Sequence, residues 1–333
     1  MNRTEFFMRL FRYLMASLCC VSLSLFVFAD ADQLLEKTGS VTFGPISEMS
    51  GIVKSKQYDD VYWVHNDSGD KPRLFALDAN WKVIIPPFLK SGYASTSEQH
   101  AKSEADSKMK GWPGNTIEAA SNIDWEDITT DGNMLYVADM GNNGNARRDL
   151  GVYVIPEPNP TATKDIRALK FLPVRFPSQQ RYPARNWHYD TESIFHSDGS
   201  LYFISKHRQP GKIDSWEQGA VLYRLDSEFT DRYNLLTEVE RSDEILVPTG
   251  ADLSPDGRHL AVICYKDVWV FSKPKIGDRW LSAPARRLSL DYKQMKTSEA
   301  VTWVDDHTLV LGNEERDLFT VSISDIPVFI SGK

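Results

Sequence analysis

Apolar and polar positions along the chain follow one arrangement five times. In each copy a short apolar strand opens at a small or acidic residue, a turn follows, and a second apolar strand ends in a polar residue or a thiol. Such runs, rich in β-branched and aromatic residues and bounded by Gly, Asn or Asp, are typical of β-strands. Strand pairs that recur at intervals of tens of residues predict a radial β-repeat. The copies begin at Ser50, Glu126, Glu192, Gly250 and Glu299.

Further strands follow each pair, and together they predict the fold class. We predict an all-β protein, a single β-propeller of four-stranded antiparallel blades, because closed rings of such units leave few exposed edges. Five blades are expected; six are the alternative, because 82–123 is long for a connection, and within it the polar stretch 95–111 reads as a loop. The fifth copy lacks a fourth strand, and 40–46 is the expected donor that closes the ring. Fourth strands are expected at 115–121, 168–176, 234–240 and 286–292.

The N-terminal residues predict a targeting segment rather than part of the fold. Three arginines precede an apolar run over 14–28, and Ala29-Asp30-Ala31 offers a small-x-small cleavage site, as in a secretory signal peptide. An uncleaved anchor is the alternative reading. We therefore expect a signal peptide over 1–31, a propeller domain over 32–333, and a secreted or periplasmic protein without a membrane segment after cleavage.

Charge and cysteine content narrow the function classes. The chain carries a formal net charge of −8 and has no basic run, so nucleic acid and anionic membrane surfaces are poor partners. Two of the three cysteines lie within the predicted signal peptide. Cys264 would then stand alone, which excludes an intramolecular disulfide. We expect a monomer that binds a small molecule or a glycan at the mouth of its channel.

Alignment of the five copies places two rows of residues on one rim of the ring, because the start of one strand of a hairpin lies beside the end of the next. The opening row carries three glutamates, and the exit row consists of His65, Asp139, Ser205, Cys264 and Asn313. Crowded carboxylates repel one another unless a cation bridges them, and calcium takes six to eight oxygen ligands. The expected calcium ligands are Glu126, Glu192, Glu299, Asp139 and Asn313.

Proton-transfer candidates come from the same rim. His65 titrates near neutral pH and follows an apolar strand, and Asp139 offers a carboxylate at the matching position of the next copy. A structural hydrogen-bonding role is the alternative for such a histidine. Cations also lie on this rim, in the segments 147–148 and 206–208. They either neutralise a bound anion or pair with the acids already present.

Several phrases of the chain resemble those of a group of secreted bacterial β-propeller proteins from which no activity carries over. The phrases are HNDSGD, IDWEDI, YVADMGNN, DTESI, TGADLSPDG and SEAVTW, and the likeness runs from about Ser47 to Glu314. More distantly, the architecture is similar to the calcium-dependent lactonase/phosphotriesterase and phytase-like propellers. That resemblance implies a metal at the channel mouth, held by acids and Asn from several blades. Ser50 and Gly250 depart from that pattern because they supply no strong ligand.

Three functions remain open on the sequence. The first is a calcium-dependent hydrolase of an ester, lactone or phosphoester, in which the ion polarises the substrate. The second is a non-catalytic propeller that binds a ligand or a protein. The third is a glycan-active propeller in which two glutamates act as acid and base. The in-register acids favour the hydrolase.

Overall fold

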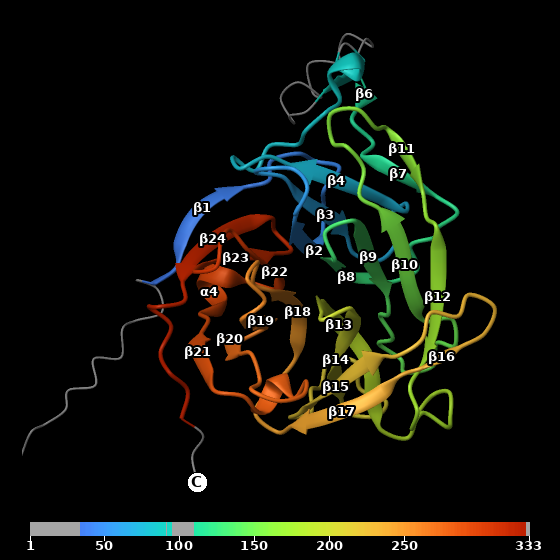
Figure 1. Ribbon diagram of the computed structural model, residues 1–333, viewed down its shortest axis with the longest axis vertical. Coiled ribbons are helices and arrows are strands. Elements are labelled where there is room, and N and C mark those ends of the chain that lie inside the picture. The colour runs from blue at the N-terminus through green and yellow to red at the C-terminus, as the bar shows by residue number, and fades with distance from the viewer. Residues whose placement is uncertain (1–33, 91, 95–109, 331–333) are drawn as a thin grey trace, which may run out of the picture. The chain divides into compact units, whose positions relative to one another are not determined.

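Five antiparallel sheets stand around a common axis in the computed structural model, which describes residues 34–90, 92–94 and 110–330 (Figure 1). The expected signal peptide and most of the expected loop at 95–111 lie outside these residues. The first two sheets share one arrangement, in which four consecutive strands are joined by a fifth, parallel strand at the outer edge. Blade 1 consists of β2 (Met49–Lys54), β3 (Tyr62–Asn66), β4 (Arg73–Leu77) and β7 (Asn115–Glu118), with β11 (Asp165–Arg167) outside. Blade 2 consists of β8 (Trp125–Thr130), β9 (Met134–Asp139), β10 (Gly151–Pro156) and β12 (Lys170–Arg175), with β16 (Asn234–Leu235) outside.

The other three sheets have four strands each, and the described part of the chain forms five blades, not six. Before β7, the described residues of segment 82–123 form the short helix η1 (Pro87–Leu89) and a two-stranded parallel sheet of β5 (Tyr93–Ala94) and β6 (Lys110–Gly111). Blade 3 consists of β13 (Trp187–Ser197), β14 (Ser200–Arg208), β15 (Ala220–Leu225) and β17 (Thr237–Ser242). Blade 4 consists of β18 (Pro248–Leu253), β19 (His259–Cys264), β20 (Asp267–Ser272) and β21 (Ala285–Ser289). Blade 5 consists of β22 (Ser298–Trp303), β23 (Thr308–Asn313), β24 (Asp317–Ser322) and β1 (Glu36–Ser40).

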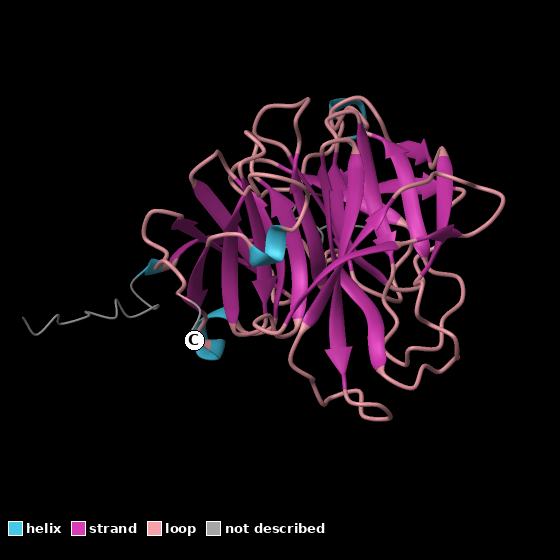
Figure 2. Ribbon diagram, turned by 60° about the horizontal axis from the view of Figure 1, so that its bottom comes forward, coloured by secondary structure: helices cyan, strands magenta, loops and turns pink. Residues whose placement is uncertain are grey.

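Helices contribute little to the architecture, as the strand-dominated view in Figure 2 shows. The named helices are η1 (Pro87–Leu89), η2 (Trp280–Ser282) and α4 (Tyr292–Met295). No helix among the described residues has the length and apolar character needed to cross a bilayer. The all-β prediction is therefore confirmed.

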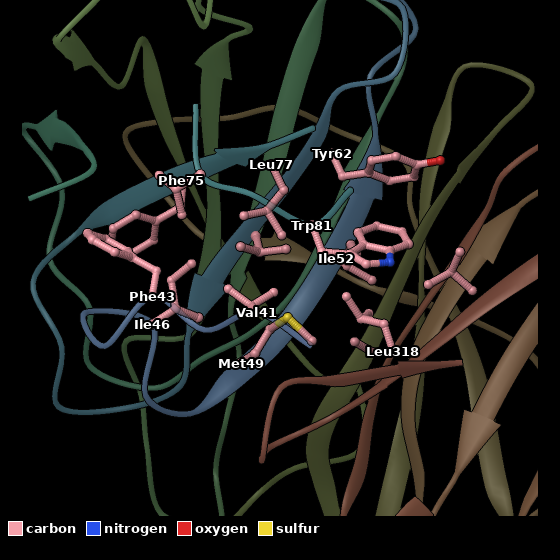
Figure 3. Packing of buried hydrophobic residues seen from close by; sticks show 14 of the residues in the cluster. Val41, Phe43, Ile46, Met49, Ile52, Tyr62, Phe75, Leu77, Trp81 and Leu318 are labelled. Carbon is pink, nitrogen blue, oxygen red and sulfur yellow. The ribbon is translucent and has the colours of Figure 1, made fainter. Parts of the chain in front are cut away.

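The N-terminal strand closes the ring, as expected, but its bounds differ from the expected ones. Strand β1 pairs antiparallel with β24, so residues 36–40 rather than 40–46 complete blade 5. The following residues leave the sheet because their side chains pack under blade 1: Phe43 and Ile46 are buried, and Phe43 contacts Phe75 edge-on at 6.1 Å between ring centroids (Figure 3). Burial of each such side chain stabilises the fold by roughly 1.5–3 kcal/mol.

Two expected outer strands also shift. The fourth strand of blade 3 is β17, whereas residues 234–235 form β16, which crosses to blade 2 and pairs in parallel with β12. The expected strand 286–292 ends earlier, at Ser289, because Asp291 caps the short helix α4 through the backbone N–H of Lys293. Both differences arise at the outer edges of the blades, and the partner of β16 lies about sixty residues away in the sequence.

Every innermost hairpin carries a β-bulge at the same rim of the ring. In blades 1, 2, 4 and 5 the register shifts directly after the first residue pair of the hairpin, whereas blade 3 has two shifts, one after Trp187 and one after Thr191. An extra residue in one strand redirects its side chain, and bulges are frequent beside functional sites. The unpaired positions begin at Ser50, Glu126, Glu192, Thr249 and Glu299.

One buried carboxylate ties three innermost strands together just below this rim. Asp127 in β8 accepts a hydrogen bond from the backbone N–H of Ile194 in β13 (2.8 Å) and another from that of Ala251 in β18 (3.1 Å), both at Oδ2. Its Oδ1 accepts from the N–H of Ile128 at 2.8 Å. The side chain therefore joins blades 2, 3 and 4 across the centre of the ring.

Candidate functional site

The bulges explain why the opening row reaches the channel mouth. Glutamate occupies the bulge in blades 2, 3 and 5, whereas Ser50 and Thr249 occupy it in blades 1 and 4. The hydroxyls of these two residues bind backbone carbonyls of the next blade, with Ser50 donating to Glu126 and Thr249 donating to Ser298. The rim residue of blade 4 is thus Thr249, and Gly250 lies one position deeper than the sequence alignment placed it.

Five carboxylates from three consecutive blades gather at this mouth. Two sets of three each bring one carboxylate oxygen per residue within 4.8 Å of the others, and Glu126 belongs to both sets. We call these residues the mouth cluster. Its members are Asp67 after β3, Asp124 and Glu126 at the start of β8, and Asp190 and Glu192 in β13.

One half of the mouth cluster forms no ion pair with the described cationic side chains. Asp67, Asp124 and Glu126 form no ion pair there, and no described donor binds the Glu126 carboxylate, although this residue is only 5% exposed. Leaving a buried carboxylate without a partner costs several kcal/mol, so such a group is either protonated or bound to a cation. This half is the part of the mouth with unsatisfied binding capacity.

The other half is neutralised from within blade 3. Lys206 in β14 forms an ion pair with Glu192, and Arg208 pairs with Asp190 at 3.1 Å and with Glu192 at 3.5 Å. Asp190 also accepts a hydrogen bond from the backbone N–H of Asn142 at 2.7 Å. All four charged side chains are buried, so these pairs are part of the folded structure rather than a solvated surface.

A close backbone approach requires glycine beside the open half. A Cβ atom at Gly141 would overlap Oε1 of Glu126 and Oδ2 of Asp124. The backbone N–H of Gly141 instead donates to the Asp124 carbonyl at 3.2 Å, which holds the loop after β9 against the start of β8. The glycine therefore makes room for two carboxylates to share one space.

Burial and mutual repulsion disturb the titration of the mouth cluster. Burial, with Glu192 nearby, raises the pKa of Glu126 well above its ordinary value. Burial, with Asp67 nearby, raises the pKa of Asp124 to about 6. Burial also raises the pKa of Glu192 to about 7, against the influence of Lys206. Burial alone would lower the pKa of Lys206, but Glu192 raises it well above its usual range, so the ammonium stays charged.

The expected ligands fall into different environments. Glu126 and Glu192 lie in the mouth cluster, but Glu192 is paired with Lys206. Asp139 accepts from the N–H of Asp124 at 3.1 Å and pairs with Arg147 at 2.9 Å. Burial raises the pKa of Asp139, with Arg147 opposing the shift.

The two expected ligands from blade 5 are not brought into the mouth cluster. Glu299 is buried, but it belongs to neither set of three carboxylates found in the described part of the chain. Burial, with Glu192 nearby, raises the pKa of Glu299 well above its ordinary value. The side-chain oxygen Oδ1 of Asn313 accepts a hydrogen bond from the backbone N–H of Asp317 at 2.8 Å.

His65, the expected proton-transfer residue, lies beneath the rim. The residue of blade 1 that pairs with the start of its first strand is Asn66, so His65 sits one position deeper than expected. Its ring is fully buried against Trp125, with 5.7 Å between the ring centroids, and Nδ1 lies 2.9 Å from the Asn66 carbonyl. Burial lowers the pKa of His65 to about 4, so the imidazole is neutral at pH 7.

Three members of the mouth cluster were not predicted as ligands from the sequence. Asp124 and Asp190 each stand two residues before a rim glutamate, and alternate residues of a strand share one face. This spacing could have identified both aspartates as further ligand candidates. Asp67 belongs to the polar HNDSGD segment after β3, and only the meeting of blades 1 and 2 brings it beside Glu126.

Comparisons with known proteins find only distant likenesses in structure. No protein-family model and no curated protein sequence matches the chain. A luciferin-regenerating enzyme is similar in structure with a TM-score of 0.42 and 10% identity, covering 90% of this chain and 79% of that one. A putative 6-phosphogluconolactonase from Bacteroides uniformis has a TM-score of 0.38 and 13% identity, covering 81% and 67%. The PQQ-bound aldose sugar dehydrogenase of Streptomyces coelicolor has a TM-score of 0.43 and 8% identity, covering 86% and 97%. At such values none of them informs the chemistry of this chain.

Proposed function

We propose that the protein is a calcium-dependent hydrolase of an ester, lactone or phosphoester, with its ion at the channel mouth. The observation that carries the proposal is the Glu126 carboxylate, which is buried, lacks a described donor, and lies within 4.8 Å of acidic oxygens from Asp67 and Asp124. Carboxylate oxygens are the ligands that calcium prefers. Asp67, Asp124 and Glu126 would hold the ion.

The other half of the cluster supports this assignment because its carboxylates already have cationic partners. Glu192 and Asp190 already have Lys206 and Arg208 as partners, so their negative charges are balanced without a metal. A bound calcium ion would polarise a substrate oxygen and lower the pKa of a coordinated water. Asp139 is hydrogen-bonded to the backbone of Asp124, a member of the cluster, whereas the His65 ring is fully buried.

Calorimetric titration of the full chain with calcium tests the proposal. We expect wild type to bind, Glu126→Gln to lose at least about a hundredfold in affinity, and Glu299→Gln to bind like wild type. Glu299 is the matched control because it occupies the same bulge position in blade 5, is also buried, and lies outside both carboxylate sets.

The remaining outcomes separate the competing functions. Absence of heat and of any calcium-dependent change in melting temperature would refute the metal site. Equal losses in both variants would move the ion toward the centre of the ring and favour the ligand set expected from the sequence. If calcium binds, esters, lactones and phosphoesters are assayed with and without chelator. Binding without turnover of any of them would identify a non-catalytic binding propeller.

A further inference from the structure

A second charged cleft lies on the outer side of the loop before β13. It has a volume of about 320 Å³ and is lined by Tyr189 and by residues of segment 178–186, among them Arg181 and Arg185. No carboxylate lines it in the part of the chain that the structure describes. This is a local excess of positive charge in a chain whose formal net charge is −8.

The two arginines are available for a ligand. Both side chains are exposed, and neither forms an ion pair or a hydrogen bond with a described residue. A third guanidinium stands at the same loop, where Arg148 lies over the Tyr182 ring at 4.3 Å. Guanidinium groups bind phosphate oxygens in a bidentate manner, and several of them favour a multiply charged oxyanion over a carboxylate.

The loop that carries these arginines is held in place by Asn145, a buried residue of the loop after β9. The Asn145 carbonyl accepts the N–H of Ala184 at 3.0 Å and the side-chain amide of Gln179 at 3.1 Å. Its side-chain oxygen accepts the N–H of Tyr189 at 2.8 Å. The cleft is therefore pre-formed, which reduces the ordering cost of binding.

The cleft and the mouth cluster meet at adjacent residues of β13. Tyr189 lines the cleft, whereas the next residue, Asp190, belongs to the mouth cluster. The two sites are therefore neighbours along the chain at the start of β13, where the register shifts between Trp187 and Asp190. Occupancy of the cleft would bring negative charge near the acidic mouth without sharing a ligand with it.

We propose that this cleft binds an oxyanion of the phosphate monoester class through Arg181 and Arg185. The organic part of such a ligand finds room in the remaining volume, beside the Tyr189 side chain. The proposal is independent of the metal at the mouth, because no member of the mouth cluster lines the cleft.

Titration of the full chain with inorganic phosphate, in the presence of a chelator, tests the proposal. The chelator excludes recruitment of phosphate by a metal. We expect Arg181→Gln/Arg185→Gln to weaken phosphate binding at least about tenfold, each single variant to weaken it less, and acetate to bind at least about tenfold more weakly than phosphate. Arg232→Gln is the control, because Arg232 is an exposed arginine on another loop, where it lies over Phe229.

Melting temperatures, the control variant and acetate binding decide the outcome. Unaltered melting temperatures show that the exposed substitutions preserve the fold, and Arg185→Gln alone serves if the double variant is less stable. Absence of phosphate binding by wild type, or equal loss in the Arg232→Gln control, would overturn the site. Acetate binding as tight as phosphate binding would overturn the phosphate class.

Discussion

Replacement of Asp127 should show how strongly one side chain joins the blades. Asp127→Ala removes the acceptor of two N–H groups that belong to other blades, those of Ile194 and Ala251. A buried donor left without a partner costs about 1–3 kcal/mol, so we expect the free energy of unfolding to fall by about 2–6 kcal/mol.

The charge of Asp127 acts in the opposite direction, and a second variant separates the two effects. Burial raises the pKa of Asp127 well above its ordinary value, although three backbone N–H groups favour the ionised form. Asp127→Asn keeps one oxygen that can accept from both Ile194 and Ala251, while removing the buried charge. Its loss should therefore be smaller, about 1–3 kcal/mol, since only the N–H of Ile128 loses its acceptor.

Urea unfolding measures these differences. Glu228→Ala is the control, because Glu228 is exposed and pairs with Lys170 on the surface; its loss should stay below about 1 kcal/mol. A loss below about 1 kcal/mol for Asp127→Ala, or equal losses for the alanine and asparagine variants, would refute the inter-blade role of the hydrogen bonds.

Three further predictions follow from the rims of the channel. Gly141→Ala should weaken calcium binding at least about tenfold by calorimetry, because the added methyl group would displace Glu126 and Asp124. Gly144→Ala is the control and should leave the affinity unchanged, because there is open space around Gly144. Similar calcium affinities in both variants would contradict the geometry. Lys206→Met should cost up to about 3–5 kcal/mol in urea unfolding, because it removes the nearer of the two cations that pair with Glu192 and leaves Arg208 at 3.5 Å. Lys206→Met/Glu192→Leu should recover most of this loss; a double variant as unstable as the single one would contradict the prediction. Burial raises the pKa of Asp252 to about 6, so its contribution to stability is full below about pH 4 and is lost as the pH rises through 6. The stability of Asp252→Asn relative to wild type should therefore increase by up to about 3 kcal/mol between pH 4 and pH 8. A pH-independent difference between the two proteins would exclude this titration.

The repeating hairpins could be predicted because their signal is local. Strand periodicity, turn residues and the recurrence of one phrase fix which segments pair with their immediate neighbours, and these define the blades. The rim glutamates of blades 2, 3 and 5 were predictable for the same reason, since each opens a recurring strand. The missing fourth strand of the last repeat indicated closure by the N-terminal segment, which β1 confirms.

Register was decided only by the tertiary structure. A β-bulge adds a residue to one strand, so alignment by phrase placed His65 and Gly250 at the rim, whereas Asn66 and Thr249 occupy it. A shift of one residue moves each side chain of a strand to the opposite face. His65, expected at the rim, is therefore buried beneath it. No local pattern in the sequence marks such an insertion.

Charge pairing was likewise decided by the assembly of the ring. The sequence supplied acids and cations on one rim, but not which of them meet. Lys206 neutralises Glu192 within one hairpin, whereas Asp67 reaches Glu126 from a different blade. Contacts between blades join residues about sixty positions apart, and their energies depend on burial, which only the folded ring provides. The sequence by itself therefore determined the blades and the acidic rim, and the tertiary structure determined which carboxylates remain free to bind a cation.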